Sequence, residues 1–182
     1  VERERIKPFI AARVAREIRD GDVINLGIGL PTLVPDYLPP GIRVTLHSEN
    51  GMMGTGPTPT AETALPYHVT DAGGSPASVL PGGAFFDSGM SFAIARGGHL
   101  SATVLGALQV DEAGSIANWQ VPGVRSPGMG GAMDLLSGGG RVIVAMEHTV
   151  GGRPKIMKKC TLPLTALHCV DLIVTEMCVI EV

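Results

Sequence analysis

The segment VINLGIG, residues 23–29, predicts a short apolar strand that ends in a glycine turn at Gly27 and Gly29. A second apolar run, Val44–His47, predicts a strand that ends in the sequence SENG at residues 48–51. Short apolar strands that alternate with helical segments are typical of an α/β domain with a largely parallel sheet. Ligand sites in such sheets lie where the strands end, so we expect both segments to contribute to one site.

The other elements expected from periodicity and turn residues fit the same architecture. An amphipathic helix is expected over residues 8–20 and should end at Gly21. Its apolar stripe begins with Phe9 and Ile10. Further helices are expected over 32–38 and near 92–95 and 133–136, and further strands over 78–80, 102–105, 142–146 and 172–175. We therefore predict a single domain over residues 1–182, with an open sheet flanked by helices.

The composition excludes several classes of protein. Apolar residues make up 45% of the 182 residues, charged residues make up 17%, and the formal net charge is −3. A nucleic-acid partner is not expected, because proteins that bind nucleic acid carry a basic surface. No uninterrupted apolar run reaches the ~18 residues of a membrane helix, so no membrane contact is expected. The excess of apolar residues favours a subunit interface instead.

The cysteines indicate neither a metal site nor a disulfide framework. Cys160, Cys169 and Cys178 are odd in number and nine residues apart, a spacing that fits neither. We expect small, buried, reduced side chains, as in cytoplasmic proteins. The first residues are charged and no apolar signal segment follows them, which also favours a cytoplasmic location.

The glycine turn also suggests a dinucleotide site. Gly27 and Gly29 follow a strand, and Glu49 comes 22 residues after Gly27, near the ~20 residues of the ribose-binding acid in that motif. However, the third glycine position holds Thr32, and Pro31 interrupts the turn. We therefore reject the dinucleotide interpretation. A glycine turn still lets backbone amides approach a ligand, so Gly27 and Gly29 stay candidate ligand contacts.

Glu49 is the candidate nucleophile. It follows an apolar strand and lies between Ser48 and Asn50, whose side chains can hydrogen-bond its carboxylate or a covalent adduct. Gly51 lets a bulky ligand come near the backbone. A carboxylate held in this way can form a covalent intermediate, which needs backbone N–H donors nearby and exclusion of water. The alternative for a single glutamate here is an exposed acid in a turn.

A second glycine run, GMGGAMD at residues 128–134, precedes an expected helix. It can present free backbone amides to an oxyanion or a phosphate, or it can be a tight turn between a strand and a helix. The spacing alone leaves both interpretations open. Asp134 suits the first turn of a helix, where a negative charge complements the helix dipole.

Other polar side chains carry weaker signals. The basic cluster at residues 155–159 can meet phosphate groups, but a solvated surface is its more ordinary role. His47 neighbours the proposed site, but attack by a carboxylate does not require a histidine. His99 and His148 have no metal-ligand spacing, so we expect both to be structural and predict no metal site.

Together these segments resemble the class I CoA-transferases, specifically the B (β) subunit of the bacterial short-chain enzymes. The matching runs are VINLGIGLPTLVPDYLP (23–39), LHSENGMMGTGP (46–57), LPGGAFFDSGMSFAIARGGHL (80–100), VLGALQVDEAGSIANWQVPG (104–123), GMGGAMDLL (128–136) and KIMKKCTLPLT (155–165). They cover nearly the whole chain. LHSENG and GMGGAMDL are long and specific.

The resemblance implies roles for individual residues. The glutamate of SENG is the covalent nucleophile in that family, which implies Glu49 here. The second glycine run helps to bind the acyl-CoA and its oxyanion, which implies Gly130, Gly131 and Ala132. Asn25 is expected beside the CoA site. The implied reaction is a ping-pong transfer of CoA between carboxylic acids through an anhydride and a glutamyl-CoA thioester.

The resemblance also implies a fold and a partner. The expected fold is the open α/β sheet that CoA-transferases share with certain sugar-phosphate isomerases. An A (α) subunit should complete the CoA pocket, in an A2B2 heterotetramer. The substrates would be acyl-CoA thioesters and carboxylates, with no metal, redox group or other permanently bound cofactor.

Three departures bear on the substrate and on the length of the chain. Gly74 stands where the 3-oxoacid branch usually has lysine, and it resembles the acetate/butyrate–acetoacetate branch of the 3-oxoacid CoA-transferase family. Met52 and Met53 replace larger residues after SENG and can reshape the acyl pocket. The C-terminal segment is expected to be short or missing. Alternative functions are an acyl-CoA decarboxylase or hydrolase on the same fold, or a non-catalytic CoA-binding subunit.

Overall fold

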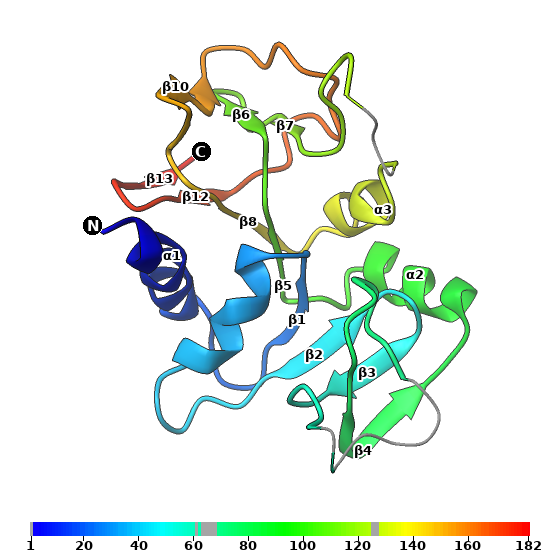
Figure 1. Cartoon of the computed structure of the whole chain (residues 1–182). Helices are drawn as coiled ribbons and strands as arrows, with labels where there is room; N and C mark the ends of the chain where they lie inside the picture. Colours follow the sequence, from blue (N-terminus) through cyan, green and yellow to red (C-terminus); the bar gives the residue numbers. More distant parts are fainter. Residues whose placement is uncertain (1, 61, 63–68, 125–127) are drawn as a thin grey trace.

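The computed structural model describes residues 2–60, 62, 69–124 and 128–182 and is built on an eight-stranded sheet (Figure 1). The strands lie in the order β13 (Val179–Glu181), β12 (Leu172–Val174), β8 (Arg141–Ala145), β5 (Ala102–Leu105), β1 (Val23–Leu26), β2 (Thr45–Ser48), β3 (Met52–Thr55) and β4 (Val79–Phe85). From β12 to β2 all neighbours are parallel. The strands β13, β3 and β4 are antiparallel additions at the two edges. The open, largely parallel sheet predicted from the sequence is therefore confirmed.

Helices and small sheets complete the architecture. The helical segments are η1 (Arg3–Arg5), α1 (Ile6–Ala15), η2 (Leu30–Tyr37), α2 (Ser88–Arg96) and α3 (Ala132–Ser137). A three-stranded sheet has the order β11 (Ile156–Met157), β6 (Gln109–Asp111) and β7 (Ile116–Ala117), and β9 (Thr149–Val150) pairs with β10 (Arg153–Pro154). In the part of the chain that the structure describes, no helix has the length and apolar character that crossing a membrane requires.

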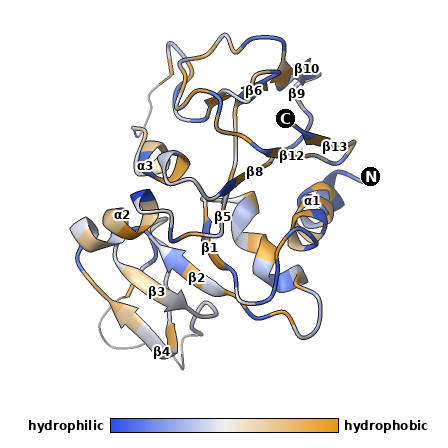
Figure 2. Ribbon diagram, turned by 180° about the vertical axis from the view of Figure 1, so that it is seen from behind, coloured by the Kyte–Doolittle hydropathy of each residue, from blue (hydrophilic) through white to orange (hydrophobic). Residues whose placement is uncertain are grey.

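The central strands are buried on both faces, which explains why they read as continuous apolar runs. In β8, Ile143 and Ala145 pack in one core cluster with α1, η2 and β12. Val142 and Val144 point to the opposite cluster, which contains Leu136 of α3 and the strands β6 and β7. This alternation follows from the two-residue period of a strand. Figure 2 shows the hydrophobic residues along these central elements.

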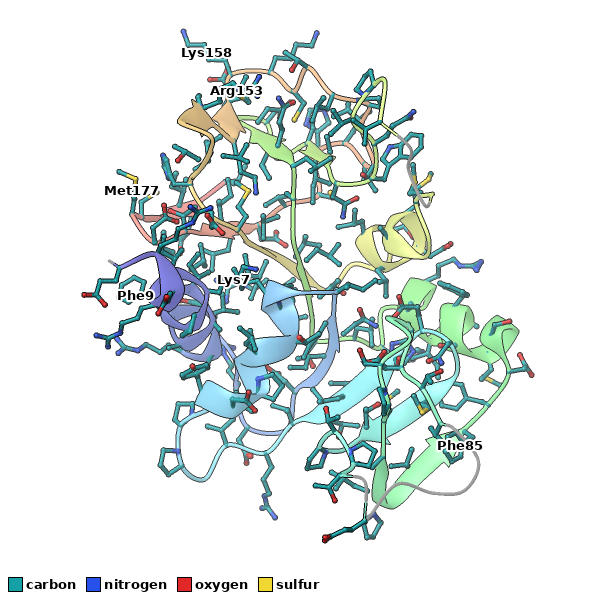
Figure 3. The ribbon with its side chains drawn as sticks, viewed as in Figure 1. Lys7, Phe9, Phe85, Arg153, Lys158 and Met177 are labelled. Carbon is teal, nitrogen blue, oxygen red and sulfur yellow. The ribbon has the colours of Figure 1, made fainter. Side chains whose placement is uncertain are left out.

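The first helix is shorter than the sequence predicts. It ends at Ala15 instead of residue 20, and turns lead from there to Gly21, whose φ of 84° requires a left-handed backbone. The predicted apolar stripe is also wrong in one position, because Phe9 is half exposed and points away from the sheet (Figure 3). Ile10 and Val14 are fully buried, as expected.

The segment predicted as a helix over residues 32–38 is a 3-10 helix over Leu30–Tyr37. Pro35 lies inside it and has no N–H to donate, so an α-helical hydrogen-bond ladder cannot form there. This difference matters for function, because the glycine turn at Gly29 does not lead into an α-helix as a dinucleotide-binding turn does.

The other predicted strands and helices are present, with small shifts. The strands β1 and β5 have the predicted bounds, and β2, β8 and β12 differ by one residue at one or both ends. β4 extends from the predicted 78–80 to Phe85, and α2 is longer than the predicted 92–95. The sequence interpretation did not include β3, β13 or the two small sheets.

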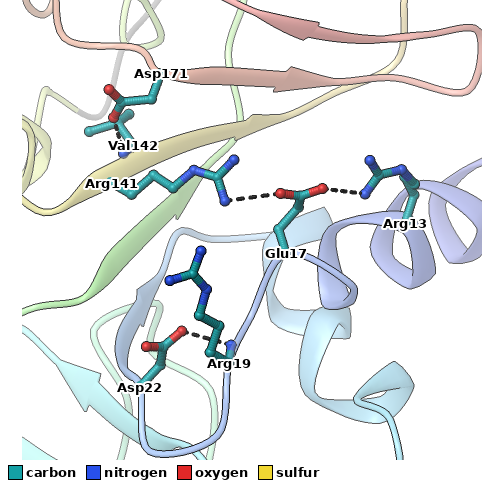
Figure 4. A network of polar contacts seen from close by, with 7 residues as sticks. All are labelled: Arg13, Glu17, Arg19, Asp22, Arg141, Val142 and Asp171. Atoms are coloured by element: carbon teal, nitrogen blue, oxygen red, sulfur yellow. Dashed lines mark hydrogen bonds and ion pairs between the residues drawn. The ribbon is translucent and has the colours of Figure 1, made fainter.

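Glu17 links the segment after α1 to the sheet through ion pairs (Figure 4). Its two carboxylate oxygens accept hydrogen bonds from Arg13 at 2.6 Å and from Arg141 of β8 at 2.9 Å. Burial alone would raise the pKa of Glu17, but the two guanidinium groups hold it below its usual value. Asp171 accepts a hydrogen bond from the amide of Val142 at 2.7 Å and extends the polar edge at this end of the sheet.

Candidate active site

Glu49 lies in the three-residue loop that joins β2 to β3. The strands pair through Ser48 and Met52, and the amide of Gly51 donates a hydrogen bond to the carbonyl of Ser48 at 3.0 Å. Gly51 has a φ of 122°, and a side chain there would collide with the carbonyl oxygen of Phe86. Glycine is therefore required at this position, and it fixes the tight turn that presents Glu49 at the end of the parallel strand β2.

Asn25 holds the carboxylate of Glu49 from the neighbouring strand. Its side-chain nitrogen donates to a carboxylate oxygen of Glu49 at 3.0 Å and to the carbonyl oxygen of His47 at 3.2 Å. The parallel pairing of β1 with β2 sets Asn25 opposite His47, two residues before Glu49. Asn25 is 1% exposed, whereas Glu49 is half-buried. The two segments that the sequence analysis assigned to one site therefore do meet.

The second glycine run also reaches this point. A side chain at Gly131 would lie 3.3 Å from the Cγ atom of Glu49 and 2.8 Å from the ring of Phe92. Gly131 is the residue before α3, and Ala132 begins that helix, whose first amides have no acceptor within the helix. Gly130 adopts a φ of +60° with open space around it. Gly131 therefore lies beside Glu49, and the oxyanion role of Gly130, Gly131 and Ala132 stays a prediction.

The first glycine turn plays a more limited part. The amide of Gly27 donates to the carbonyl of Val104 at 2.8 Å, so it is not a free donor for a ligand. Its missing side chain permits close packing, because a Cβ atom would lie 2.9 Å from the side chain of Leu105. Gly29 adopts a φ of +86° in open space before η2. Ligand contact by Gly27 and Gly29 stays a prediction.

The side chains on either side of Glu49 do not bond its carboxylate, contrary to our expectation. Asn50 donates to the carbonyl of Thr70 at 2.8 Å, and the hydroxyl of Ser48 accepts from the amide of Ala72 at 2.9 Å. Both therefore tie the loop at residues 70–76 to the turn that carries Glu49. This loop contains Gly74, the residue that resembles the acetate/butyrate–acetoacetate branch of the family.

His47 and Ser91 extend the polar contacts around Asn25. The Nδ1 atom of His47 lies 3.2 Å from the side-chain nitrogen of Asn25, and the Nε2 atom lies 2.9 Å from the hydroxyl of Ser91. The imidazole also stacks on Phe86, with ring centroids 6.4 Å apart. Burial lowers the pKa of His47, and the Glu49 carboxylate opposes that shift. The sequence interpretation gave His47 no role, although a polar residue inside an apolar strand was the available signal.

Other polar residues named from the sequence have partners of their own or lie at the surface. Asp134 pairs with Arg96 at 3.2 Å, a contact with α2 that the helix-dipole interpretation did not include. His148 contacts Thr175 at 3.2 Å. Lys158 points outward from the molecule (Figure 3), as a solvated surface predicts. Lys155 differs, because it is half-buried, and this burial lowers its pKa.

The cysteines are free but less buried than expected. All three are partly exposed. Burial, together with a nearby aspartate, raises the pKa of Cys160 and of Cys169 to about 11. Both thiols are therefore protonated near neutral pH, which does not suit a nucleophile. Among the described residues, no group of three or more His, Cys, Asp or Glu side chains is arranged to hold a metal ion.

Two cavities differ in their relation to the site. The larger, of about 660 Å³, lies at the amino end of β8 and β12, against Arg141 and Asp171, far from the strand ends that carry Glu49. The smaller, of about 230 Å³, lies at the carboxyl end of the parallel strands and is lined by Ile28, Met146 and Lys155 among others. The smaller one lies at the edge where ligand sites of parallel sheets are found, although Glu49 and Asn25 are not among the residues that line it.

The sequence matches the Coenzyme A transferase family over residues 8–182. The chain belongs to this family. It is 59% identical over 174 residues to the acetate CoA-transferase subunit beta of Escherichia coli, covering 95% of this chain and 79% of that protein. It is 53% identical over 175 residues to the mitochondrial succinyl-CoA:3-ketoacid coenzyme A transferase 2B of Mus musculus, covering 95% of this chain but 34% of that protein.

The fold is similar to that of a solved structure. The acyl-CoA transferase YdiF of Escherichia coli superposes with a TM-score of 0.68 at 19% identity, covering 94% of this chain and 35% of that chain. The predicted resemblance to a CoA-transferase B subunit and the predicted enzyme class are thereby confirmed. The CoA-transferase family uses CoA thioesters as substrates.

Proposed function

We propose that this chain is the B subunit of a short-chain acyl-CoA:carboxylate CoA-transferase in which Glu49 carries the CoA group. The observation that supports the proposal most is the arrangement of Glu49 itself. Its carboxylate receives an N–H from buried Asn25, and Gly131 lies against its side chain. A nucleophile needs this combination of a fixed carboxylate and open backbone at the reacting group.

The reaction proceeds by two exchanges at Glu49. A carboxylate oxygen attacks the thioester carbonyl carbon, the C–S bond breaks, and an acyl-glutamyl anhydride and CoA thiolate form. The thiolate then attacks the glutamyl carbonyl carbon, the C–O bond to the donor acid breaks, and a glutamyl-CoA thioester remains. The acceptor carboxylate reverses both steps and leaves as the new acyl-CoA. No net proton is released or consumed.

Asn25 serves the second exchange directly. When thiolate adds to the glutamyl carbonyl, the negative charge develops on a glutamyl oxygen, and the Asn25 N–H already lies 3.0 Å from one of the two. A donor in place before the charge develops needs no reorganisation during the reaction. Backbone amides near Gly131 and Ala132 would serve the oxyanion of the transferred acyl group.

A partner subunit is part of the proposal. Bacterial relatives of similar length are named as beta subunits, and the mammalian relatives, whose names give no subunit, are about three times longer than the matching segment. The cavity at the carboxyl edge is smaller than the ~300–1,000 Å³ of most ligand pockets, which fits a site completed by another chain. Large apolar side chains are exposed, including Ile28 of this cavity at 76% and Phe85 at the end of the edge strand β4 at 63%. We infer an A (α) subunit and an A2B2 assembly.

The favoured substrates are acetate, butyrate, acetoacetate and their CoA thioesters. This choice is supported by Gly74 and by the name of the acetate CoA-transferase relative. Coenzyme A enters as a thioester substrate, with no permanent cofactor. The cytoplasmic location expected from the sequence stays a prediction.

The test uses the chain in complex with its A subunit. With acetoacetyl-CoA and acetate, the wild-type complex should form acetyl-CoA, and Glu49→Ala should abolish exchange while the complex still assembles. Borohydride added after acyl-CoA should inactivate the wild type by reducing the glutamyl-CoA thioester, and should do so only when acyl-CoA is present. Exchange that persists in Glu49→Ala would refute the nucleophile. Release of CO2 or free CoA without transfer would favour a decarboxylase or a hydrolase.

A further inference from the structure

The side chains of Ser91, His47, Asn25 and Glu49 form one continuous line of polar contacts. The successive distances are 2.9 Å from Ser91 to His47, 3.2 Å from His47 to Asn25, and 3.0 Å from Asn25 to Glu49. The first three residues are 0%, 4% and 1% exposed. They come from α2, β2 and β1, so the line crosses three elements and reaches the proposed nucleophile at its half-buried end.

The direction of each hydrogen bond follows from the chemistry of the groups. The carboxylate of Glu49 and the backbone carbonyl of His47 only accept, so the end of the Asn25 amide that faces both must be the NH2 group. The Nδ1 atom of His47 faces that NH2 group and must therefore carry no proton. The proton of the neutral imidazole is then on Nε2, and it donates to the hydroxyl of Ser91.

The Asn25 amide is held at its nitrogen end alone. Within the described residues, the Oδ1 atom of Asn25 has no hydrogen-bond partner, although the residue is only 1% exposed. A buried amide oxygen without a partner is unusual and costs stability, so the contacts of the nitrogen must outweigh that cost. If the amide turned over, its oxygen would face the carboxylate of Glu49, and the donor to the nucleophile would be lost.

We propose that His47, fixed by Ser91, is a positioning residue that orients the Asn25 amide and thereby keeps an N–H donor on Glu49. His47 does not touch the reacting atoms. It acts by presenting an unprotonated Nδ1 to Asn25, while the hydroxyl of Ser91 accepts from Nε2 and fixes the orientation of the ring. The inference rests on the proposed role of Glu49, which it deepens.

Protonation of His47 breaks this arrangement. A proton on Nδ1 would face the NH2 group of Asn25 at 3.2 Å, donor against donor. The charged group on the β2–β3 turn that faces His47 is Glu49. Its carboxylate raises the pKa of His47, but burial lowers that pKa by more. From β1 the facing group is the neutral Asn25. On α2 the facing group is Ser91, whereas Asp87 caps the helix start and Arg96 pairs with Asp134.

Two substitutions separate the two nitrogens of the ring. In His47→Asn, the amide oxygen lies near the position of Nδ1 and can still accept from Asn25, whereas the contact to Ser91 is lost. In His47→Gln, the amide reaches toward Ser91, and the acceptor for Asn25 is lost. Neither replacement titrates. His99 is exposed and makes no contact with this network, so His99→Gln is the matched control.

The measurement is kcat and KM of the A–B complex between pH 5 and 8.5. We expect His47→Gln to lower kcat about tenfold or more with little change in KM, and His47→Asn to stay within about threefold of the wild type. The fall in kcat toward acid pH that the wild type and His99→Gln share should be absent in His47→Asn. Equal losses in both His47 variants would indicate only a packing role and overturn the proposal, as would wild-type kcat in His47→Gln.

A spectroscopic test is independent of activity. Nitrogen NMR of the histidine-labelled chain in the complex should show His47 as the neutral ring with its proton on Nε2 at pH 7.5. Asn25→Ala, which removes the NH2 group that faces Nδ1, should abolish that single tautomer. A proton on Nδ1 in the wild type would overturn the proposal. If the wild type shows the Nε2 tautomer but neither exchange nor borohydride trapping, the proposed function fails while the assignment of the hydrogen bonds stands.

Discussion

The side-chain nitrogen of Asn25 lies 3.0 Å from a carboxylate oxygen of Glu49, although 24 residues separate them in the sequence. The contact forms because β1 and β2 are parallel neighbours with Asn25 opposite His47, and the tight turn after Ser48 brings Glu49 back over the end of β1. The proposed nucleophile is therefore positioned by the sheet register together with the tight turn at Gly51.

Replacing Asn25 tests this relationship. Asn25→Ala removes the donor to Glu49 and should lower kcat about 100-fold, as loss of one oxyanion donor does in other enzymes. Asn25→Asp keeps the size of the side chain but sets a second carboxylate against Glu49, so it should lower activity further at neutral pH. Steady-state kinetics of the assembled enzyme measure both. Wild-type kcat in Asn25→Asp at pH 7.5 would show that the contact has no part in the reaction.

The turn that carries Glu49 should not tolerate a side chain at Gly51. Alanine there meets the carbonyl of Phe86 in addition to a backbone φ of 122°, so Gly51→Ala should lose about 3 kcal/mol or more of unfolding free energy. Gly41 also has a positive φ, of 89°, but has open space around it. Gly41→Ala should lose only about 1–2 kcal/mol. Urea unfolding of the two variants compares them, and equal losses would contradict the steric argument.

The sequence predicts the position of Glu49 better than its surroundings. The strand ends at Asn25 and Glu49 follow from short apolar runs and glycine turns, which are local signals. The partner of Asn50 is Thr70, 20 residues away in an irregular loop, and no periodicity indicates such a contact. The contact of Ser91 with His47 could not be predicted either, because nothing local to a serine on a helix indicates a histidine 44 residues earlier as its partner.

The same distinction between local signals and distant contacts explains which strands the sequence analysis predicted and which it missed. The strands β5 and β8 are continuous apolar runs buried on both faces, so their pattern is unambiguous. β3 is MMGT and β4 contains a Pro-Gly-Gly run, and residues of this kind normally indicate a turn. Both are edge or near-edge strands whose backbone pairing alone defines them. Pairing of this kind depends on tertiary contacts that a single sequence does not display.

Asn50 should control the loop at residues 70–76 instead of the chemistry. Asn50→Ala removes the hydrogen bond to Thr70 and leaves the carboxylate of Glu49 with its donor from Asn25. We expect faster hydrogen exchange at the amides of this loop, and a changed preference across C2 to C6 carboxylates. Borohydride trapping of the glutamyl thioester should persist. Loss of trapping in Asn50→Ala would mean that the residue contacts the intermediate after all.

Acid should destabilise the fold partly through His47. Burial holds its pKa below 6.5 in the folded chain, so the unfolded chain binds the proton more readily. The contribution of His47 is therefore complete above pH 6.5 and is lost as the pH falls from there toward the lowered folded value. The unfolding free energy of the wild type should fall more between pH 7.5 and 5.5 than that of His47→Asn, whose side chain does not titrate. Parallel curves would show that His47 does not titrate differently in the two states.

Glu17 should also contribute to stability, and its contribution should persist to a lower pH than that of His47. Its pKa is lowered in the folded chain because Arg13 and Arg141 donate to its two oxygens, so its contribution is present above pH 4.5 and is lost as the pH falls through the folded value. Glu17→Gln should cost about 1 kcal/mol of unfolding free energy at pH 7, and less in high salt because both guanidinium groups are partly exposed. Glu4 is exposed on η1, and Glu4→Gln is the matched control with no expected loss. Urea unfolding at pH 7 and pH 4 measures the difference, and a cost that is unchanged at pH 4 would contradict an ionic origin.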